Sequence, residues 1–280
     1  MDRSKVKKIQ ASQLEILKYV DDVCQKIGIN YYLAFGSLLG AIRHQGFIPW
    51  DPDIDIVLLR DDYETLRDYF FNHETDKFVY VDNTIDPNHI SPHALVINKE
   101  THILGYDNAK ILFPRKYDGV YIDIFPLDKT SVDRSEQLKQ SKRITNILSI
   151  ITLKNPIIHY GKNWNIKQVI KIFIAYLLKP ITFKFLGNLL IREMTRYRNC
   201  DSDCYVIPTL AVLFDRIVPF SYYSVPRRVK FEDKEFLIPA KSEEILKINY
   251  GDYMKFPPEE ERWKYLDTKI SKVIYENGLE

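Results

Sequence analysis

AFGSLLGAIRHQGFIPWDPDIDIVLL, residues 34–59, is the stretch that decides the fold of this chain. The apolar run that leads into it, residues 31–37, predicts a short strand that ends in a Gly-Ser pair. Residues 38–46 predict a short helix that a glycine closes. Residues 53–59 alternate acidic and apolar side chains and then become wholly apolar, which predicts a second strand. The stretch therefore predicts a strand, a helix and a strand, with polar groups where these elements meet.

Two carboxylates stand at the start of the second predicted strand. Asp53 and Asp55 are two residues apart, so their side chains point to the same face. Like charges this close repel unless a cation lies between them, and Mg²⁺ is suited because it takes carboxylate and phosphate oxygens. Asp123 lies on another predicted strand, residues 119–127, and the three carboxylates converge if that strand pairs beside the first. Such a group suits in-line displacement at phosphorus, so we expect Asp53, Asp55 and Asp123 to be catalytic and to bind Mg²⁺ or Mn²⁺.

A Gly-Ser pair, Gly36 and Ser37, precedes these carboxylates at a strand-to-helix turn. Glycine lets the backbone approach a phosphate closely, and an N–H or hydroxyl group there can hold it. Arg43 and His44 follow on the same short helix and can bind an anionic phosphate. A lone D-x-D is usually a solvated edge or turn, but the combination with Gly-Ser is much more specific. We therefore expect Gly36, Ser37 and Arg43 to bind donor phosphates, with His44 as a contact to donor or acceptor.

The whole chain predicts an α+β (mixed α/β) protein. Helical spacing of apolar residues predicts helices over residues 8–28 and 61–73, the second with Asp61 as its N-cap. Several strands are expected over residues 78–125. The expected parts are a catalytic core over residues 1–133, a basic helical subdomain over residues 134–199, and a C-terminal part over residues 200–280 that completes the core and the active-site cleft.

The composition excludes several classes of protein. The 280 residues are 45% hydrophobic and 28% charged, as in an ordinary globular protein. The net charge of +2 argues against a dedicated nucleic-acid binder. Three cysteines are too few for a disulfide framework, and the first residues lack the apolar segment of a signal peptide. We therefore expect a cytoplasmic protein without a membrane-spanning helix.

One segment is much more basic than the net charge of the whole chain suggests. From Gln137 to Arg192 there are ten Lys and Arg residues and no Asp or Glu. One interpretation is a pair of interfacial helices that makes a peripheral contact with the inner face of the cytoplasmic membrane. The other, which we prefer, is a helical subdomain that packs on the core and keeps its lysines in solvent. The missing acids keep both interpretations open.

Two further patterns do not predict a metal site. Cys200 and Cys204 have no second Cys or His pair close in sequence, and zinc needs about four ligands. His89 and His93 are four residues apart, but the prolines beside them argue against a helix. We interpret them as loop histidines.

Three segments in the same order resemble the LicD family: residues 34–59, GVYIDIFPLD at 119–128, and FEDKEFLIPAKSEEILKINYGDYMKFPPEEER at 231–262. This family is similar to fukutin-type proteins and belongs to the nucleotidyltransferase superfamily. Its best-known members transfer phosphocholine from CDP-choline to bacterial surface glycans. The resemblance implies a nucleotidyltransferase-like core sheet flanked by helices, with a helical insertion in the middle of the chain. It also supports the three carboxylates as metal site and the Gly-Ser pair as donor phosphate site.

Some residues depart from the family pattern or stay without a derived role. Pro52 stands where family members carry an acid, and residues 261–267 lack the histidines that often follow the last motif. Trp50 lies next to the carboxylates and is a candidate for an aromatic contact with the choline ammonium, or a packing residue. Asp252 belongs to the last motif and is a candidate donor or acceptor contact, or the cap of a turn.

The expected function is a metal-dependent phosphotransferase. It would move a phospho-alcohol group, phosphocholine from CDP-choline first, onto a hydroxyl of a bacterial cell-surface glycan and release CMP. The glycan could belong to lipopolysaccharide, capsule or teichoic acid, and ethanolamine, glycerol or ribitol phosphate would use the same metal chemistry. The alternatives are a nucleotidyltransferase that moves NMP from an NTP to a small molecule, or a non-catalytic glycan- or nucleotide-binding protein.

Overall fold

The structure is a computed structural model that describes residues 3–73, 75–86, 88–89, 91–104, 109–111, 116–159, 166–209, 211–262 and 272–275. The helices in this part are α1 (Arg3–Ile27), α2 (Phe35–His44), α3 (Arg60–Asn72), α4 (Arg134–Lys154), α5 (Ile166–Leu177), α6 (Phe183–Met194), α7 (Ser242–Tyr250) and α8 (Glu259–Arg262), with short 3-10 helices η1 (Ala211–Asp215) and η2 (Phe220–Tyr222). The strands are β1 (Tyr32–Leu33), β2 (Asp55–Leu59), β3 (Phe78–Val81), β4 (Ala94–Asn98), β5 (Thr101–Leu104), β6 (Ala109–Ile111), β7 (Tyr121–Lys129), β8 (Ile157–His159), β9 (Cys204–Val206), β10 (Val218–Pro219), β11 (Arg227–Phe231), β12 (Lys234–Ile238) and β13 (Lys272–Tyr275). The predicted α+β class is confirmed, and the three-part division of the chain stays a prediction.

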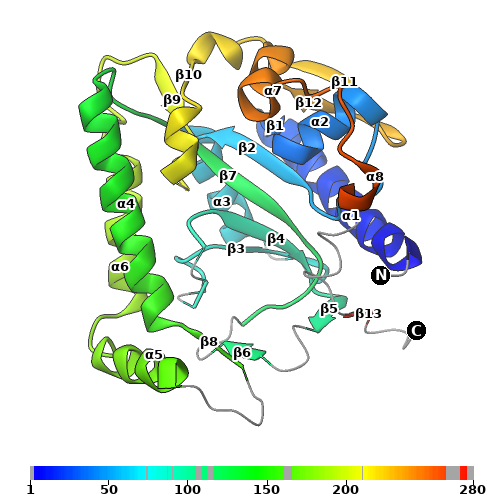
Figure 1. Cartoon of the computed structure of the whole chain (residues 1–280). Coiled ribbons are helices and arrows are strands. Elements are labelled where there is room, and N and C mark those ends of the chain that lie inside the picture. Colours follow the sequence, from blue (N-terminus) through cyan, green and yellow to red (C-terminus); the bar gives the residue numbers. More distant parts are fainter. Residues whose placement is uncertain are drawn as a thin grey trace.

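The central sheet has the strand order β1-β2-β7-β4-β3, with β9 added to β7 and β10 to β9 (Figure 1). Strands β2 and β7 run parallel, and Asp55 lies opposite Asp123 in their register. The other pairs in this sheet are antiparallel. The strand that carries Asp123 therefore does pair beside the strand that carries Asp55, which is what a shared carboxylate site requires.

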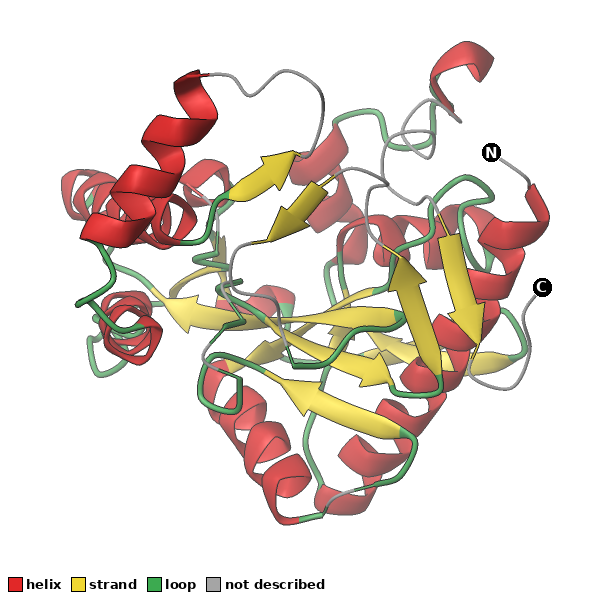
Figure 2. Cartoon of the chain, turned by 90° about the horizontal axis from the view of Figure 1, so that it is seen from below, coloured by secondary structure: helices red, strands yellow, loops and turns green. Residues whose placement is uncertain are grey.

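The hydrophobic core forms where helices cover this sheet. Helix α1 packs against β4 and β7, and α3 packs against β2, β3 and β7. Ile16 and Leu17 of α1 and Leu66 of α3 are fully buried, as is Ile56 of β2. Figure 2 shows the strands gathered at the centre of the molecule with helices around them. Since each buried side chain of this size stabilises the fold by about 1.5–3 kcal/mol, the core holds β2 and β7 in a fixed register.

The chain enters α2 earlier than the sequence predicted. The strand expected over residues 31–37 is only the two residues of β1, and Gly36 and Ser37 lie in the first turn of α2 instead of at a strand end. Phe35 has a left-handed φ of 43°, which turns the backbone directly from β1 into the helix. The Gly-Ser pair therefore offers helical N–H groups, not a strand terminus.

Helix α3 also starts one residue before the predicted cap. Leu59 is the N-cap and Arg60 the first helical residue, so the prediction of Asp61 as N-cap was wrong. Arg60 turns its side chain inward to the buried carboxylate of Asp128, at 2.5 Å between Nη2 and Oδ2. Asp61 lies in the first turn, where its negative charge still favours the helix N-terminus.

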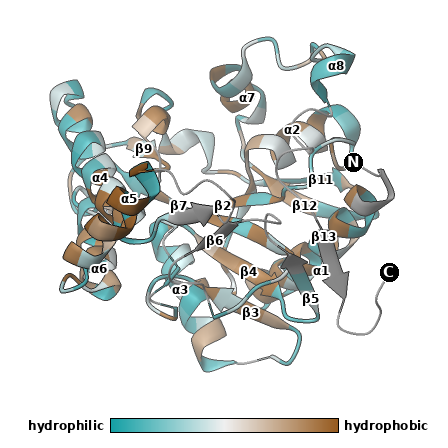
Figure 3. Cartoon of the chain, turned by 60° about the horizontal axis from the view of Figure 1, so that its bottom comes forward, coloured by the Kyte–Doolittle hydropathy of each residue, from teal (hydrophilic) through white to brown (hydrophobic). Residues whose placement is uncertain are grey.

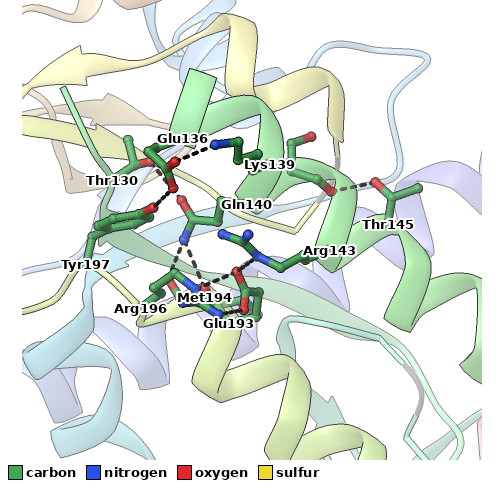
Figure 4. Close-up of polar contacts among 11 residues, drawn as sticks. Thr130, Glu136, Lys139, Gln140, Arg143, Thr145, Glu193, Met194, Arg196 and Tyr197 are labelled. Atoms are coloured by element: carbon green, nitrogen blue, oxygen red, sulfur yellow. Dashed lines mark hydrogen bonds and ion pairs between the residues drawn. The ribbon is translucent and has the colours of Figure 1, made fainter. Parts of the chain in front are cut away.

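Helices α4 and α6 form a layer beside the sheet with a hydrophobic cluster of their own. Figure 4 shows the polar contacts that fix this layer. Gln140 accepts a hydrogen bond from Thr130, directly after β7, at 2.8 Å and donates to the carbonyl of Glu193 at 2.9 Å. Arg143 donates to the Glu193 carboxylate at 2.6 Å. The cluster itself consists of Ile144, Ile147, Ile151, Leu186, Leu190, Met194, Val206 and Phe214.

The C-terminal part of the chain packs against β1 and α2. Strand β12 lies against β1, while β11 and α7 lie against α2. At the β11–β12 turn the Glu232 carboxylate accepts from the Phe47 N–H at 2.9 Å, which ties the hairpin to the segment after α2. Figure 1 shows α7 and α8 near α2 as a result. Nowhere in the described ranges is a helix long and apolar enough to cross a membrane.

Candidate active site

An open cavity lies where the N-terminus of α2 meets the loop before β2 and the C-terminal segment. Four predicted site residues meet there: Gly36, Trp50, Asp53 and Asp55. The other lining residues were not predicted from the sequence. Two of them belong to the motifs: Asp51 starts the acidic run, and Arg262 ends the third motif. The full lining is Phe35, Gly36, Trp50, Asp51, Asp53, Asp55, Tyr250, Pro257, Glu261 and Arg262.

The acidic run is fixed by contacts with α2. The Ser37 hydroxyl is buried and accepts a hydrogen bond from the Asp55 N–H at 2.9 Å. A Cβ atom on Gly36 would lie 2.4 Å from Oδ2 of Asp51, so glycine allows this carboxylate to approach the helix. Asp51 Oδ1 in turn accepts from the Asp53 N–H at 3.3 Å. Gly36 and Ser37 thus position the carboxylates, and the phosphate contact that the sequence suggested for them stays a prediction.

Asp123 stands beside Asp55 on the neighbouring strand and contacts a histidine. Because the two residues are in register on paired strands, their side chains lie on the same face of the sheet. Asp123 Oδ1 lies 2.8 Å from Nε2 of His93, and the two side chains are 17% and 20% exposed. His93 also packs its ring against Phe125, with centroids 4.5 Å apart. The sequence gave no sign of this contact, because the antiparallel pairing of β4 with β7 creates it.

The N-terminus of helix α2 lies at the cavity, with the Asp51 carboxylate beside its first turn. Its N-cap, Ala34, makes no side-chain hydrogen bond to the first turn, and Phe35 and Gly36 line the cavity. The first N–H groups of a helix lack intrahelical partners and carry the positive end of the helix dipole. This end of α2 can therefore hold a phosphate.

One wall of the site is built from aromatic rings and cations. The Arg262 guanidinium lies 5.2 Å from the centre of the Trp50 ring and 5.4 Å from that of Phe256. Arg43 lies 4.6 Å from the Phe256 ring and donates to the carbonyl of Tyr253 at 2.8 Å. The structure therefore uses Arg43 to hold the loop after α7, while Arg262 lines the cavity.

His44 completes this wall from the C-terminal turn of α2. Its ring lies edge-on to Trp50 and to Phe256, with centroids 6.1 and 5.5 Å apart. Burial lowers the pKa of His44, and the charge of Arg43 lowers it further. Its Nε2 is buried and has no hydrogen-bond partner within the part of the chain that the structure describes. His44 is therefore a neutral ring that supports Trp50.

The C-terminal motif supplies Tyr250 to the cavity. Burial raises the pKa of Tyr250, and the negative charges of Asp55 and Asp51 raise it further. The hydroxyl thus stays protonated and can donate a hydrogen bond close to the carboxylates. Asp252 is exposed and absent from the cavity lining, and its carbonyl accepts from the Lys255 N–H at 3.1 Å.

The donor set suits a hard cation that shares its ligands with phosphate. Asp53 and Asp55 line the cavity with carboxylate oxygens. Among the described residues no three or more His, Cys, Asp or Glu side chains are arranged to hold a metal ion by themselves. Mg²⁺ commonly takes one or two carboxylates and completes its shell with substrate phosphates and water. The residues therefore fit a metal that arrives with a diphosphate, and they do not form a closed structural metal site. The three cysteines are free thiols.

Part of the chain that lines this cavity is similar to a known domain. Residues 28–147 match the model of the LicD/FKTN/FKRP nucleotidyltransferase domain, a range that holds every predicted site residue except Asp252. The lipopolysaccharide cholinephosphotransferase LicD of Haemophilus influenzae is 29% identical over 257 residues, 89% of this chain and 91% of its own length. The ribitol 5-phosphate transferase FKRP of Homo sapiens is 46% identical over 48 residues, 17% of this chain and 10% of its own.

Proposed function

We propose, from the match of residues 28–147 to the LicD/FKTN/FKRP nucleotidyltransferase domain, that this chain is a LicD-family glycan phosphotransferase with a nucleotidyltransferase-like core. It moves a phospho-alcohol group, phosphocholine from CDP-choline in the first instance, onto a hydroxyl of a bacterial cell-surface glycan and releases CMP. The glycan hydroxyl oxygen forms a bond to phosphorus, the bond from phosphorus to the CMP oxygen breaks, and the hydroxyl proton passes to a base. The observation that carries the proposal is that the acidic run Asp51–Asp55 lines one cavity together with the N-terminus of α2.

The carboxylates provide the place for a divalent cation. Asp53 and Asp55 would hold Mg²⁺ or Mn²⁺, with Asp123 on the next strand as a third ligand or as the group that takes the proton. When bound, the ion neutralises the charge of the donor diphosphate. His93 orients the Asp123 carboxylate through the 2.8 Å contact. Gly36 and Ser37 fix the acidic run so that these oxygens stay close together.

Two features of the chain itself serve the donor phosphates. Phe35 and Gly36 at the start of α2 line the cavity, and the N–H groups of this helix end would bind a donor phosphate. Arg262 adds a permanent positive charge on the opposite lining segment, since a guanidinium stays protonated at every relevant pH. Arg43 contributes by anchoring the loop after α7 that carries Phe256 toward the site.

The aromatic wall favours a cationic alcohol. Trp50 and Phe256 already accept the Arg262 cation on or near their faces, at 5.2 and 5.4 Å. A quaternary ammonium is bound by aromatic rings through the same attraction. We infer that choline would share this wall with Arg262, whereas ribitol or glycerol would gain nothing from it. The name of the Haemophilus influenzae relative supports the same choice.

The proposal is tested by CMP release from purified protein with Mg²⁺. The donors are CDP-choline, CDP-ethanolamine, CDP-glycerol, CDP-ribitol and the nucleoside triphosphates, each with and without an acceptor glycan. We expect CMP from CDP-choline, lost on addition of EDTA and in Asp53→Ala. Asp68→Ala is the matched control, because Asp68 is an exposed carboxylate on α3 outside the cavity.

Each other outcome points to a different function. Pyrophosphate from a triphosphate, without CMP from any CDP-alcohol, would show a nucleotidyltransferase. CMP from CDP-ribitol alone would keep the phosphotransferase and reject choline. If no donor gives a product in the presence of acceptor glycans, a binding protein is favoured. Equal CMP release by Asp53→Ala and wild type would contradict the role proposed for Asp53.

A further inference from the structure

Helix α5 turns an apolar face to the solvent. Within this helix, all of which the structure describes, Ala175 is the one buried residue. The exposed apolar residues recur three, four and seven positions apart, so they form one stripe opposite Ala175. Figure 3 colours α5 mostly as hydrophobic, at the outer side of the helical layer. The stripe, called the α5 surface below, consists of Ile166 (69% exposed), Val169 (45%), Ile170 (50%), Phe173 (62%), Tyr176 (64%) and Leu177 (63%).

The rest of the layer fixes this orientation. The buried Lys154 at the end of α4 donates to the carbonyl of Leu178 at 3.1 Å, directly after the last residue of α5. A lysine at this position satisfies carbonyls that a helix C-terminus leaves open. Its ammonium also lies 4.8 Å from the ring of Phe183, the first residue of α6. The junction of the three helices therefore holds α5 with its apolar stripe outward.

The segment of the chain that contains α5 carries positive charges and no acid from Gln137 to Arg192. The two acids that border the acid-free segment are engaged in ion pairs: Glu136 with Lys139 at 2.8 Å and Glu193 with Arg143 at 2.6 Å. Lysine stems can lie along an apolar surface while the ammonium groups reach polar headgroups. The exposed lysines on α5, on the turn after it and in the first turn of α6 are Lys167, Lys171, Lys179 and Lys184.

We propose that the α5 surface docks on an anionic lipid bilayer, with Ile170 and Phe173 at the acyl boundary and the lysines at the headgroups. An exposed apolar stripe flanked by lysines is the pattern of helices that lie in a membrane interface. A second copy of the chain would bring two positive surfaces together, which like-charge repulsion disfavours. This inference goes beyond the proposed transfer reaction and does not depend on it.

Co-sedimentation with lipid vesicles tests the proposal without any substrate. The whole chain is mixed with vesicles of phosphatidylcholine alone or of phosphatidylcholine and phosphatidylglycerol in equal parts. We expect it to sediment with the anionic vesicles only, and Val169→Gln/Ile170→Gln/Phe173→Gln to bind at least about tenfold more weakly. Phe71→Gln is the matched control, because Phe71 on α3 is 73% exposed and lies outside the α5 surface.

The lysines are tested separately. Each lysine close to an anionic surface contributes about 1 kcal/mol, so Lys171→Gln/Lys179→Gln should weaken binding about thirtyfold. Lys230→Gln/Lys241→Gln, two exposed lysines on and beyond the β11–β12 hairpin, should leave it unchanged. Added salt should weaken wild-type binding through the same charges.

Three results would overturn the inference. The first is wild-type protein that stays in the supernatant with anionic vesicles. The second is vesicle binding that falls as much in Phe71→Gln as in the triple variant. The third is a wild-type dimer in size-exclusion chromatography that the triple variant dissociates while vesicle binding stays the same, since that would assign the α5 surface to a second copy.

Discussion

The two ends of strand β7 hold their carboxylates in different ways. Asp123 near the start is 17% exposed, stands beside Asp55 and contacts His93 at 2.8 Å. Asp128 near the end is 2% exposed and receives two hydrogen bonds from Arg60, at 2.7 and 2.5 Å. Asp128 is thus buried and paired with the guanidinium of Arg60, whereas Asp123 is more exposed and lies beside the acidic run.

We propose that this difference separates a carboxylate that stabilises the fold, Asp128, from one that belongs to the proposed site, Asp123. A buried ion pair that loses one partner leaves an uncompensated charge in the interior, so the Asp128 end is fixed by stability. The acidic run near the other end lines an open cavity, where water, a cation or a phosphate can reach it. Variants near Asp123 should therefore lose activity, whereas variants near Asp128 should lose stability.

Asp55→Asn should give the largest effect, on activity alone. We expect kcat/KM for CMP release to fall about 10³–10⁵-fold, because Asp55 is a proposed metal ligand and its loss would remove several kcal/mol of charge stabilisation. The free energy of unfolding should change by less than about 1 kcal/mol, because the side chain lies at the rim of a cavity. Steady-state rates and urea unfolding check both parts. A variant that loses stability in proportion to activity would make Asp55 a structural residue.

Arg60→Met should give the opposite result. It leaves Asp128 buried without a cation, and we expect the free energy of unfolding to fall by about 3–5 kcal/mol. Activity measured well below the melting temperature should stay within about threefold of wild type, since Arg60 does not line the cavity. Arg60→Met/Asp128→Leu is the control: it removes both charges and should recover much of the loss. A single variant as stable as wild type would contradict the assigned role of the ion pair.

The sequence predicted the end of β7 that carries Asp123 better than the end that carries Asp128. Asp53 and Asp55 alternate on a short acidic run that needs no tertiary contact to be recognised. The pairing of β2 with β7 was only a condition for the three carboxylates to converge, and the structure meets it. The Arg60–Asp128 pair joins residues that only the parallel register of β2 and β7 brings together. Likewise His93 reaches Asp123 through the pairing of β4 with β7. The exposed stripe of α5 was also beyond the sequence, because periodicity shows that a helix has an apolar face but not which face packs.

Asp21 is a third carboxylate to compare, because its contribution to stability should depend on pH. Asp21 of α1 is fully buried and contacts Arg228 at 2.7 Å and Lys234 at 3.0 Å. Burial alone would raise the pKa of Asp21, but hydrogen bonds from Arg228, Lys234 and Tyr31 bring it below the ordinary value. A lowered folded-state pKa stabilises the protein above about pH 4 and ceases to do so as the pH falls through the folded value.

Asp21→Asn should therefore cost about 2–4 kcal/mol of unfolding free energy at neutral pH. The difference between variant and wild type should shrink as the pH falls below about 4, where the wild-type carboxylate takes up its proton. Urea unfolding at a series of pH values measures this difference. A constant difference across the acid range would show that the ion pairs of Asp21 do not supply its stabilisation.

His93→Gln is the smallest change, and it tests whether the contact of Asp123 is part of the site or of the fold. Groups that orient a metal-binding carboxylate typically affect metal affinity about ten- to a hundredfold. We expect the Mg²⁺ concentration for half-maximal activity to rise by such a factor, with a stability loss below about 1 kcal/mol because the pair is partly exposed. His73→Gln is the matched control, because His73 is exposed and directly follows the last residue of α3. It should change neither the Mg²⁺ dependence nor the stability. If His93→Gln lowers stability but leaves the Mg²⁺ dependence unchanged, Asp123 belongs with Asp128 as a carboxylate of the fold.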